Sequence, residues 1–166
     1  MRCAIWVIVG LLLSACQAPL QKISTNTAKS FQGLALIQTT KERFTLRVSG
    51  RMQADTLVLD LRDGTGLYQM QLQFQNQHLI QARSGKQTYS QAQITEHCQQ
   101  ALHIPLPKLP WQTLLGARKA PTSSLKFDDF LVKYLDYEAH PPWHLPKRMH
   151  ISASHWQVQL IIRQWR

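Results

Sequence analysis

The feature that most constrains the fold is a strict alternation of apolar and polar side chains. In the clearest stretch, residues 68–75, tyrosine, methionine, leucine and phenylalanine alternate with four glutamines. Successive side chains of a β-strand point to opposite faces of a sheet, so this stretch predicts a strand with one apolar face. Leucine alternates in the same way over 57–61, and Phe44, Leu46 and Val48 alternate with arginine and threonine. The chain is therefore expected to form a sheet that is apolar on one side.

Short connections between these runs indicate an antiparallel sheet. Asp63-Gly64 and Ser84-Gly85 are hairpin-turn signals, and a parallel crossover would need a dozen or more residues. Further strand-like runs lie at 130–137, 149–152 and 156–163, while 94–102 and 109–115 have helical character. We expect a mainly β, α+β fold, in which a curved antiparallel sheet forms an incomplete β-barrel and short helices cover its hydrophobic cavity. A fully closed barrel is the alternative.

The N-terminal segment predicts export and lipidation. Arg2 precedes an apolar run at residues 3–13, which is too short to span a bilayer of about 30 Å and is typical of a signal peptide. Leu13-Ser14-Ala15-Cys16 matches the bacterial lipobox, in which the cysteine is acylated and becomes the first mature residue. Two or three acyl chains anchor a protein almost irreversibly, because each buried methylene contributes about 0.8 kcal/mol. The alternative is an ordinary secretory signal followed by a chance cysteine.

These signals divide the chain into three parts. Residues 1–15 are the predicted signal peptide, 16–30 the lipidated Cys16 with a polar tether, and 31–166 one folded domain. Gln17 rather than aspartate follows the cysteine, which favours the periplasmic face of the outer membrane. The net charge of +10 would otherwise suggest a nucleic-acid partner, but this compartment excludes one. We expect a lipid-anchored monomer.

Cysteine usage indicates that the fold is held by its core. Cys3 would leave with the signal peptide and Cys16 would carry lipid, so Cys98 remains as a single thiol that cannot form an intrachain disulfide. A nucleophilic Cys98 would need a neighbouring base, for which His97 and His103 are the candidates. We expect a buried structural thiol instead.

Several segments, in order, carry a resemblance to a known family. His103-Ile104-Pro105-Leu106 precedes Trp111-Gln112-Thr113-Leu114-Leu115-Gly116, and Val132, Tyr134 and Tyr137 precede Leu145-Pro146-Lys147-Arg148-Met149 and a last strand ending at Trp165. From about Phe44 to Trp165 this order resembles the LolB-like outer-membrane lipoproteins of the LolA/LolB superfamily. The resemblance implies an eleven-stranded incomplete barrel plugged by helices. It further implies that the cavity receives lipoprotein acyl chains from a periplasmic LolA-like carrier and releases them into the outer membrane. We therefore expect an outer-membrane lipoprotein that binds the acyl chains of a lipid or lipoprotein cargo.

The alternation also identifies residues that would line such a cavity. A sixteen-carbon acyl chain costs roughly 13 kcal/mol to expose to water, at about 0.8 kcal/mol per methylene, so a carrier must bury it in a dry, elongated pocket. Met70 is the best candidate, because methionine adapts to varied ligands, and Trp111 and Leu115 are the candidate lid residues. The alternative is a filled core under a permanently closed helix. The predicted lining residues are Leu46, Leu59, Met70, Leu72, Leu131, Ile151, Val158 and Leu160.

One loop departs from the family pattern. LolB carries a leucine that projects from the loop between its third and fourth strands and inserts cargo into the membrane. The corresponding loop here is 62–66, where Thr65 takes the place of that leucine, and Leu67 is expected to begin the following strand. This departure concerns membrane insertion and leaves the binding of a hydrophobic chain intact.

A basic stripe is the remaining candidate surface. Arg43, Arg47 and Arg51 share one face of a predicted strand. They form either an ordinary solvent face or a docking surface for an acidic carrier or anionic lipid headgroups.

No motif indicates catalysis, a cofactor or a metal. The chain has nine carboxylates and lacks a nucleophile elbow, a phosphate loop and a zincin pattern. His140 and His144 are four residues apart, but two prolines between them prevent the helix that would direct both at one metal, so a solvated loop is expected. A hydrolase would need a buried histidine–carboxylate pair in a cleft. The main alternative is a structural or accessory envelope lipoprotein with a closed core and a basic partner-binding face.

Overall fold

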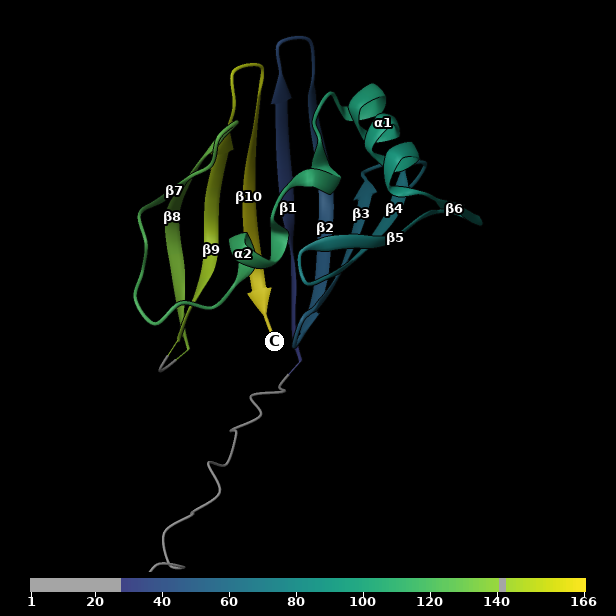
Figure 1. The fold of residues 1–166 in the computed structure, drawn as a ribbon. Coiled ribbons are helices and arrows are strands. Elements are labelled where there is room, and N and C mark those ends of the chain that lie inside the picture. The colour runs from purple at the N-terminus through teal and green to yellow at the C-terminus, as the bar shows by residue number, and fades with distance from the viewer. Residues whose placement is uncertain (1–27, 141–142) are drawn as a thin grey trace, which may run out of the picture.

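The computed structural model describes residues 28–140 and 143–166, and this part of the chain forms one ten-stranded sheet with a helical segment on one side (Figure 1). The helical segment consists of α1 (Gln91–Leu102), a 3₁₀ turn η2 (Leu106–Lys108) and α2 (Trp111–Leu115). The strands are β1 (Lys29–Thr39), β2 (Arg43–Gln53), β3 (Thr56–Asp63), β4 (Gln69–Gln75), β5 (His78–Ser84), β6 (Gln87–Tyr89), β7 (Ser124–Lys126), β8 (Leu131–His140), β9 (Trp143–Ser152) and β10 (Trp156–Trp165).

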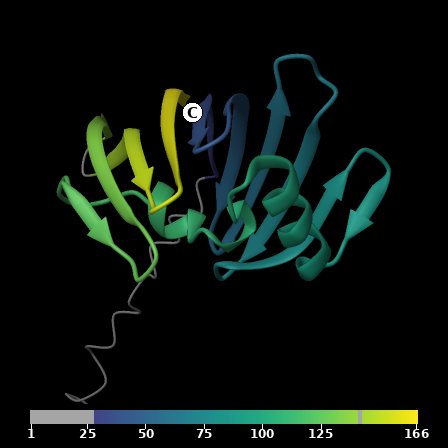
Figure 2. The ribbon, with the colours of Figure 1, turned by 90° about the horizontal axis from the view of Figure 1, so that it is seen from above.

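The sheet is antiparallel, strongly curved and open. Its strand order is β6-β5-β4-β3-β2-β1-β10-β9-β8-β7, so the first and last strands of the chain meet in the middle. The two edges, β6 and β7, have three residues each and do not pair with one another. Seen from above, the sheet curves around the helical segment, which crosses its concave side (Figure 2). The predicted incomplete barrel is confirmed, with ten strands in the described residues rather than the eleven that the resemblance implied.

The turns follow local chemistry, with one difference from expectation. β4 and β5 are joined by Asn76 and Gln77, both at positive φ, and Gly85 at φ 59° opens the two-residue turn between β5 and β6. Asp63-Gly64 does not make a tight hairpin, because the loop runs to Tyr68 before β4 begins. β1 begins at Lys29, two residues before the expected start of the folded domain.

The helical segment lies where the apolar pattern predicts it, but its second helix is shorter than expected. α1 starts in a capping box: Ser90 Oγ accepts from the Gln93 backbone N–H, and the Gln93 side chain accepts from Ser90 N–H. Leu109 is extended rather than helical, because the following Pro110 disfavours helical geometry at the residue before it. α2 therefore starts only at Trp111. None of the helices in the described ranges is both long and apolar enough to cross a membrane.

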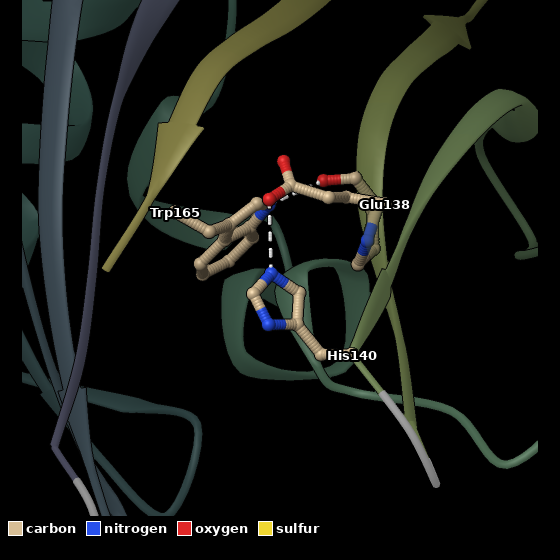
Figure 3. Close-up of polar contacts among 4 residues, drawn as sticks. Glu138, His140 and Trp165 are labelled. Atoms are coloured by element: carbon tan, nitrogen blue, oxygen red, sulfur yellow. Dashed lines mark hydrogen bonds and ion pairs between the residues drawn. The ribbon is translucent and has the colours of Figure 1, made fainter.

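Aromatic packing fills the end of the sheet at which β1 begins. The Phe31 and Trp165 rings lie 5.1 Å apart. The Trp165 indole N–H donates to the Pro146 carbonyl at 2.9 Å, the contact drawn from Trp165 in Figure 3. A Cβ at Gly50 would come within 2.2 Å of the Phe31 ring, so only glycine fits on the strand next to it. This packing joins β1, β2, β9 and β10 around one buried cluster.

Candidate functional site

Seven of the eight predicted lining residues lie on the inner, concave face of the sheet. Each is at most 2% exposed. Strand pairing places them in continuous rows, for example Leu59 beside Leu72, and Val158 beside both Ile37 and Ile151. The inner face therefore presents one unbroken apolar surface. These seven residues are Leu46, Leu59, Met70, Leu72, Ile151, Val158 and Leu160.

The prediction for Leu131 is wrong by one position. Leu131 is half-buried and pairs with Ser152, which in turn pairs with Gln157 on the outer face. Its neighbour Val132 is fully buried and pairs with Ile151. β8 carries apolar side chains on both faces, so its alternation alone did not say which set points inward.

The interior is filled rather than hollow. Trp111 and Leu115, the predicted lid residues, are buried against the inner face together with Leu114. α1 adds Ile94, Cys98 and Leu102. Because the seven inner-face residues expose so little surface, no void of water size adjoins them, so the dry, elongated pocket that we expected is not found beside these described residues. We call residues 91–115 the cover; its buried side chains fill the concave side of the sheet.

Side-chain amides and hydroxyls attach α2 to two hairpin turns on one side. The Gln112 side chain donates to the carbonyl of Asp55, in the β2–β3 turn, and accepts from the N–H of Gln77, in the β4–β5 turn. Thr113 Oγ1 donates to Gln77 Oε1 at 2.9 Å. These contacts involve no charged pair, and all of them lie at the exposed rim.

Arg118 and Tyr134 hold the other side of α2. Arg118 Nη2 donates to the Thr113 carbonyl at 3.0 Å and to Tyr134 Oη at 2.6 Å, and its guanidinium lies 4.8 Å from the centre of the Tyr134 ring. Tyr134 Oη donates in turn to the Leu114 carbonyl at 3.1 Å. Burial raises the pKa of Tyr134, which keeps this donor protonated. We call this pair the latch; sequence analysis did not find it, because only the fold brings residue 118 to β8.

The latch leaves one polar atom unsatisfied. Arg118 Nε is buried and has no hydrogen-bond partner among the described residues. The backbone of Arg118 is fixed by two hydrogen bonds to His144 on β9, of 2.7 and 3.0 Å. The Arg118 side chain is thus held on the Nη2 side of its guanidinium, by the Thr113 carbonyl and the Tyr134 hydroxyl.

Cys98 is buried, as predicted, in a cluster beneath α1. Its sulfur lies 3.7 Å from Met70 Sδ, and burial raises the pKa of the thiol to about 12. His97 stacks between Tyr68 and Tyr89, at centroid distances of 6.1 and 5.9 Å. The thiol is therefore protonated at neutral pH and belongs to the core rather than to a nucleophilic site.

The loop between β3 and β4 presents an exposed leucine. Leu67 is 90% exposed and lies in the loop, so the expectation that it begins a strand is wrong. Thr65 instead turns toward the protein: its hydroxyl donates to Asp63 Oδ2 at 2.5 Å and accepts from Leu67 N–H at 3.3 Å. The Thr65 hydroxyl and backbone N–H groups of the loop lower the pKa of Asp63, so the carboxylate that organises the loop stays ionised.

Arg43, Arg47 and Arg51 all lie exposed on the outer face of β2. Arg47 stands directly opposite Arg62 of β3. No arginine of the described residues takes part in an ion pair. Like charges in directly opposed positions destabilise a sheet, so this face holds positive charge that the fold itself does not use.

The two histidines near the prolines lie at the ends of paired strands, not in a solvated loop. His140 ends β8 and His144 lies in β9, and His140 Nε2 is 2.9 Å from Glu138 Oε1 (Figure 3). Both partners of this pair are partly exposed, so it is not the buried pair that a hydrolase would need. No set of three metal-ligating side chains gathers anywhere in the described residues. Cys16, the signal peptide and the tether up to residue 27 lie outside the described residues.

Comparison with known proteins identifies the family. The family model of the outer membrane lipoprotein LolB matches residues 28–165, which include the whole sheet and cover. Among curated proteins, none matches the chain. LolB-family proteins are non-enzymatic outer-membrane lipoproteins that take part in lipoprotein localisation and receive lipoproteins from LolA-like carriers. With its open antiparallel half-barrel and covered apolar face, this chain belongs to the LolB family of outer-membrane lipoproteins.

Proposed function

We propose that the protein is a receptor, anchored to the periplasmic face of the outer membrane through acylated Cys16, that takes up a lipoprotein acyl chain in its interior by exchange with the cover. The observation that carries this proposal is an unbroken apolar inner face, closed by a cover held through few polar contacts. The protein does no covalent chemistry. Its work is to accept an acyl chain and release it again.

The cover is built to be displaced rather than to add stability alone. α2 has only five residues, and a helix this short is not stable without tertiary contacts. The acyl chain would occupy the places of Trp111, Leu114 and Leu115, so one apolar contact replaces another. Exchange of this kind keeps uptake and release close to equal in free energy, which a transfer protein needs.

Leu67 is the residue that would contact the membrane. It supplies an exposed apolar side chain two positions after Thr65, which stands where the family's projecting leucine is expected. The loop lies at the opposite end of the sheet from the start of β1 (Figure 1). An extended chain from Cys16 to Lys29 reaches up to roughly 45 Å, and β1 is about 36 Å long, so the anchor permits this loop to touch the bilayer.

The basic face would guide the carrier. Arg43, Arg47 and Arg51 attract an acidic surface, which raises the rate of encounter more than the final affinity. These arginines lie on the outer face of the sheet, whereas the cover lies on the inner face. Docking of a carrier to them therefore leaves the cover free to move.

The test is transfer from a loaded carrier. A LolA-like carrier holding a radiolabelled lipoprotein is incubated with the full chain in liposomes, and label is followed first onto the protein and then into the bilayer. Leu67→Glu is expected to accept label but to deliver little of it. Ile80→Glu, which changes another exposed apolar residue on the outer surface, should behave like the unmodified protein.

Each result bears on the proposal. Failure of the unmodified protein to accept label, with no lipid co-purifying in native mass spectrometry, would overturn it. The filled interior would then favour the second candidate, a structural envelope lipoprotein with a permanently closed core and a basic partner-binding face. Mass spectrometry of the mature N-terminus, compared with a Cys16→Ser variant, tests the lipid anchor independently.

A further inference from the structure

The outer face of the sheet contains a hollow that shares only Arg51 with the basic face of the proposed receptor. It has a volume of about 510 Å³ and lies across β10, β1, β2, β3 and β4, near the start of β1. Small-molecule sites usually measure about 300–1,000 Å³. We call this hollow the outer groove; its lining residues are Ser30, Phe31, Gln32, Ser49, Gly50, Arg51, Val58, Asp60, Gln71, Gln164 and Arg166.

Strand register explains how these residues meet. One row of paired positions crosses five strands, and a second row runs beside it, each made of residues directly opposite one another. Both rows face outward, whereas Phe31 and Gly50, which lie between them, are buried. The first row is Gln164, Gln32, Ser49, Asp60 and Gln71. In the second row, Arg51 is paired with Ser30 on one side and with Val58 on the other. The Ser30 backbone is also hydrogen-bonded to that of Arg166.

The side chains of the groove offer polar groups at fixed positions. Gln71 Nε2 donates to Asp60 Oδ1 at 3.0 Å, and Arg166 Nη2 donates to Gln164 Oε1 at 3.2 Å. Arg51 has neither a hydrogen bond from its guanidinium nor an ion pair with any described residue. The groove therefore combines amides and hydroxyls with two guanidinium groups, one of them without a partner. Val58 is the only apolar side chain that faces outward into it.

We propose that the outer groove binds an anionic saccharide. Amide, hydroxyl and carboxylate side chains in rows match the closely spaced hydroxyls of a sugar, which both donate and accept hydrogen bonds. The guanidinium of Arg51 suits a phosphate or carboxylate on that sugar, because its planar donors pair with two oxygens at once. An extended peptide fits less well, since β1 and β2 lie inside the sheet and have no free backbone edge to pair with it.

The test measures binding of simple sugars to the full chain in detergent micelles by ligand-observed NMR titration. The probes are N-acetylmuramic acid, which carries a carboxylate, glucosamine 1-phosphate, and neutral N-acetylglucosamine. We expect both anionic sugars, or one of them, to bind at least about tenfold more tightly than the neutral sugar, as loss of a charge-assisted contact implies. Preference for the carboxylate would point to a cell-wall source, and preference for the phosphate to a glycolipid source.

Three variants distinguish binding in the outer groove from non-specific attraction to the positive charge of this face. Arg51→Gln should weaken binding at least about tenfold, whereas Arg47→Gln, on the same face of β2 but outside the groove, should change it less than about twofold. Gln71→Ala should weaken the binding of the sugars and leave the binding of inorganic phosphate unchanged. Equal losses in Arg47→Gln and Arg51→Gln, equal binding of phosphate and sugars, or no saturable binding would each overturn the proposal. Lipoprotein transfer should be unchanged in Gln71→Ala, which lies in the groove but outside the basic face, if the groove is separate from the receptor interior.

Discussion

The two faces of β4 differ sharply in side-chain chemistry and in burial. Met70, Leu72 and Phe74 point inward and are at most 1% exposed, while the glutamines between them face outward. Both sets belong to the same seven residues and share one backbone. The inner set determines how tightly the half-barrel closes on its cover, and the outer set determines what the protein contacts. In this fold, alternate residues of the same strand therefore serve different ends: the inner ones serve stability and the outer ones serve recognition.

The largest effect should come from removing an inner side chain. Leu72→Ala is expected to lower the free energy of unfolding by about 2–5 kcal/mol, because it deletes buried methyl groups and leaves a cavity. Gln73→Ala, one residue along on the outer face, should change it by less than about 0.5 kcal/mol. Urea unfolding followed by circular dichroism measures both. Similar values for the two variants would contradict the division between faces.

A smaller effect should follow from opening the latch. Tyr134→Phe removes the hydroxyl that binds the Leu114 carbonyl and Arg118, so we expect a loss of about 1–3 kcal/mol. Opening of the cover should also speed alkylation of buried Cys98 by iodoacetamide.

Tyr137→Phe is the matched control for the latch. Its hydroxyl bonds to the Thr122 carbonyl at 2.9 Å, away from the cover. It should therefore lose comparable stability without exposing Cys98. If both variants accelerate alkylation equally at the same residual stability, the latch does not control the cover.

Alkaline pH should weaken the inner cluster. Burial raises the pKa of Cys98 from its ordinary value near 9 to about 12, and burial also raises the pKa of Tyr68. The unfolded chain then loses these protons first, so the stability they contribute is complete below pH 9 and falls as the pH rises toward 12. Urea midpoints at pH 7, 9 and 10 measure the slope, and Cys98→Ala should flatten it. An unchanged slope in that variant would count against the assignment.

The smallest effect should be on the outer face. Arg62→Gln removes the like charge opposite Arg47 and is expected to raise stability by about 0.2–1 kcal/mol. The same change should slow association with an acidic carrier at low salt, measured by stopped-flow fluorescence, and the difference should shrink as salt increases. A loss of stability would contradict the repulsion between Arg47 and Arg62.

The alternation in the sequence, together with the short connections, was enough to predict an antiparallel sheet with one apolar face and seven of its inner-face residues, because period two is a local property of strands. It failed at Leu131, where both faces of β8 are apolar, and at Leu67, where Asp63 and Thr65 hold a longer loop than a hairpin signal implies. The latch and the outer groove depend on residues far apart in the chain. Register across five strands, which no local pattern encodes, brings them together.

The central claim is that an acyl chain replaces the cover inside the half-barrel. The most direct measurement is photo-crosslinking with photo-methionine, which is close in size to methionine and would replace buried Met70 and Met149 as well as half-buried Met52. After the full chain has been loaded from a carrier bearing an acylated lipoprotein and irradiated, peptides are mapped by mass spectrometry. The account predicts acyl adducts on the peptides containing Met70 and Met149. Successful transfer with no adduct at either residue would show that the acyl chain is carried elsewhere and would contradict the account.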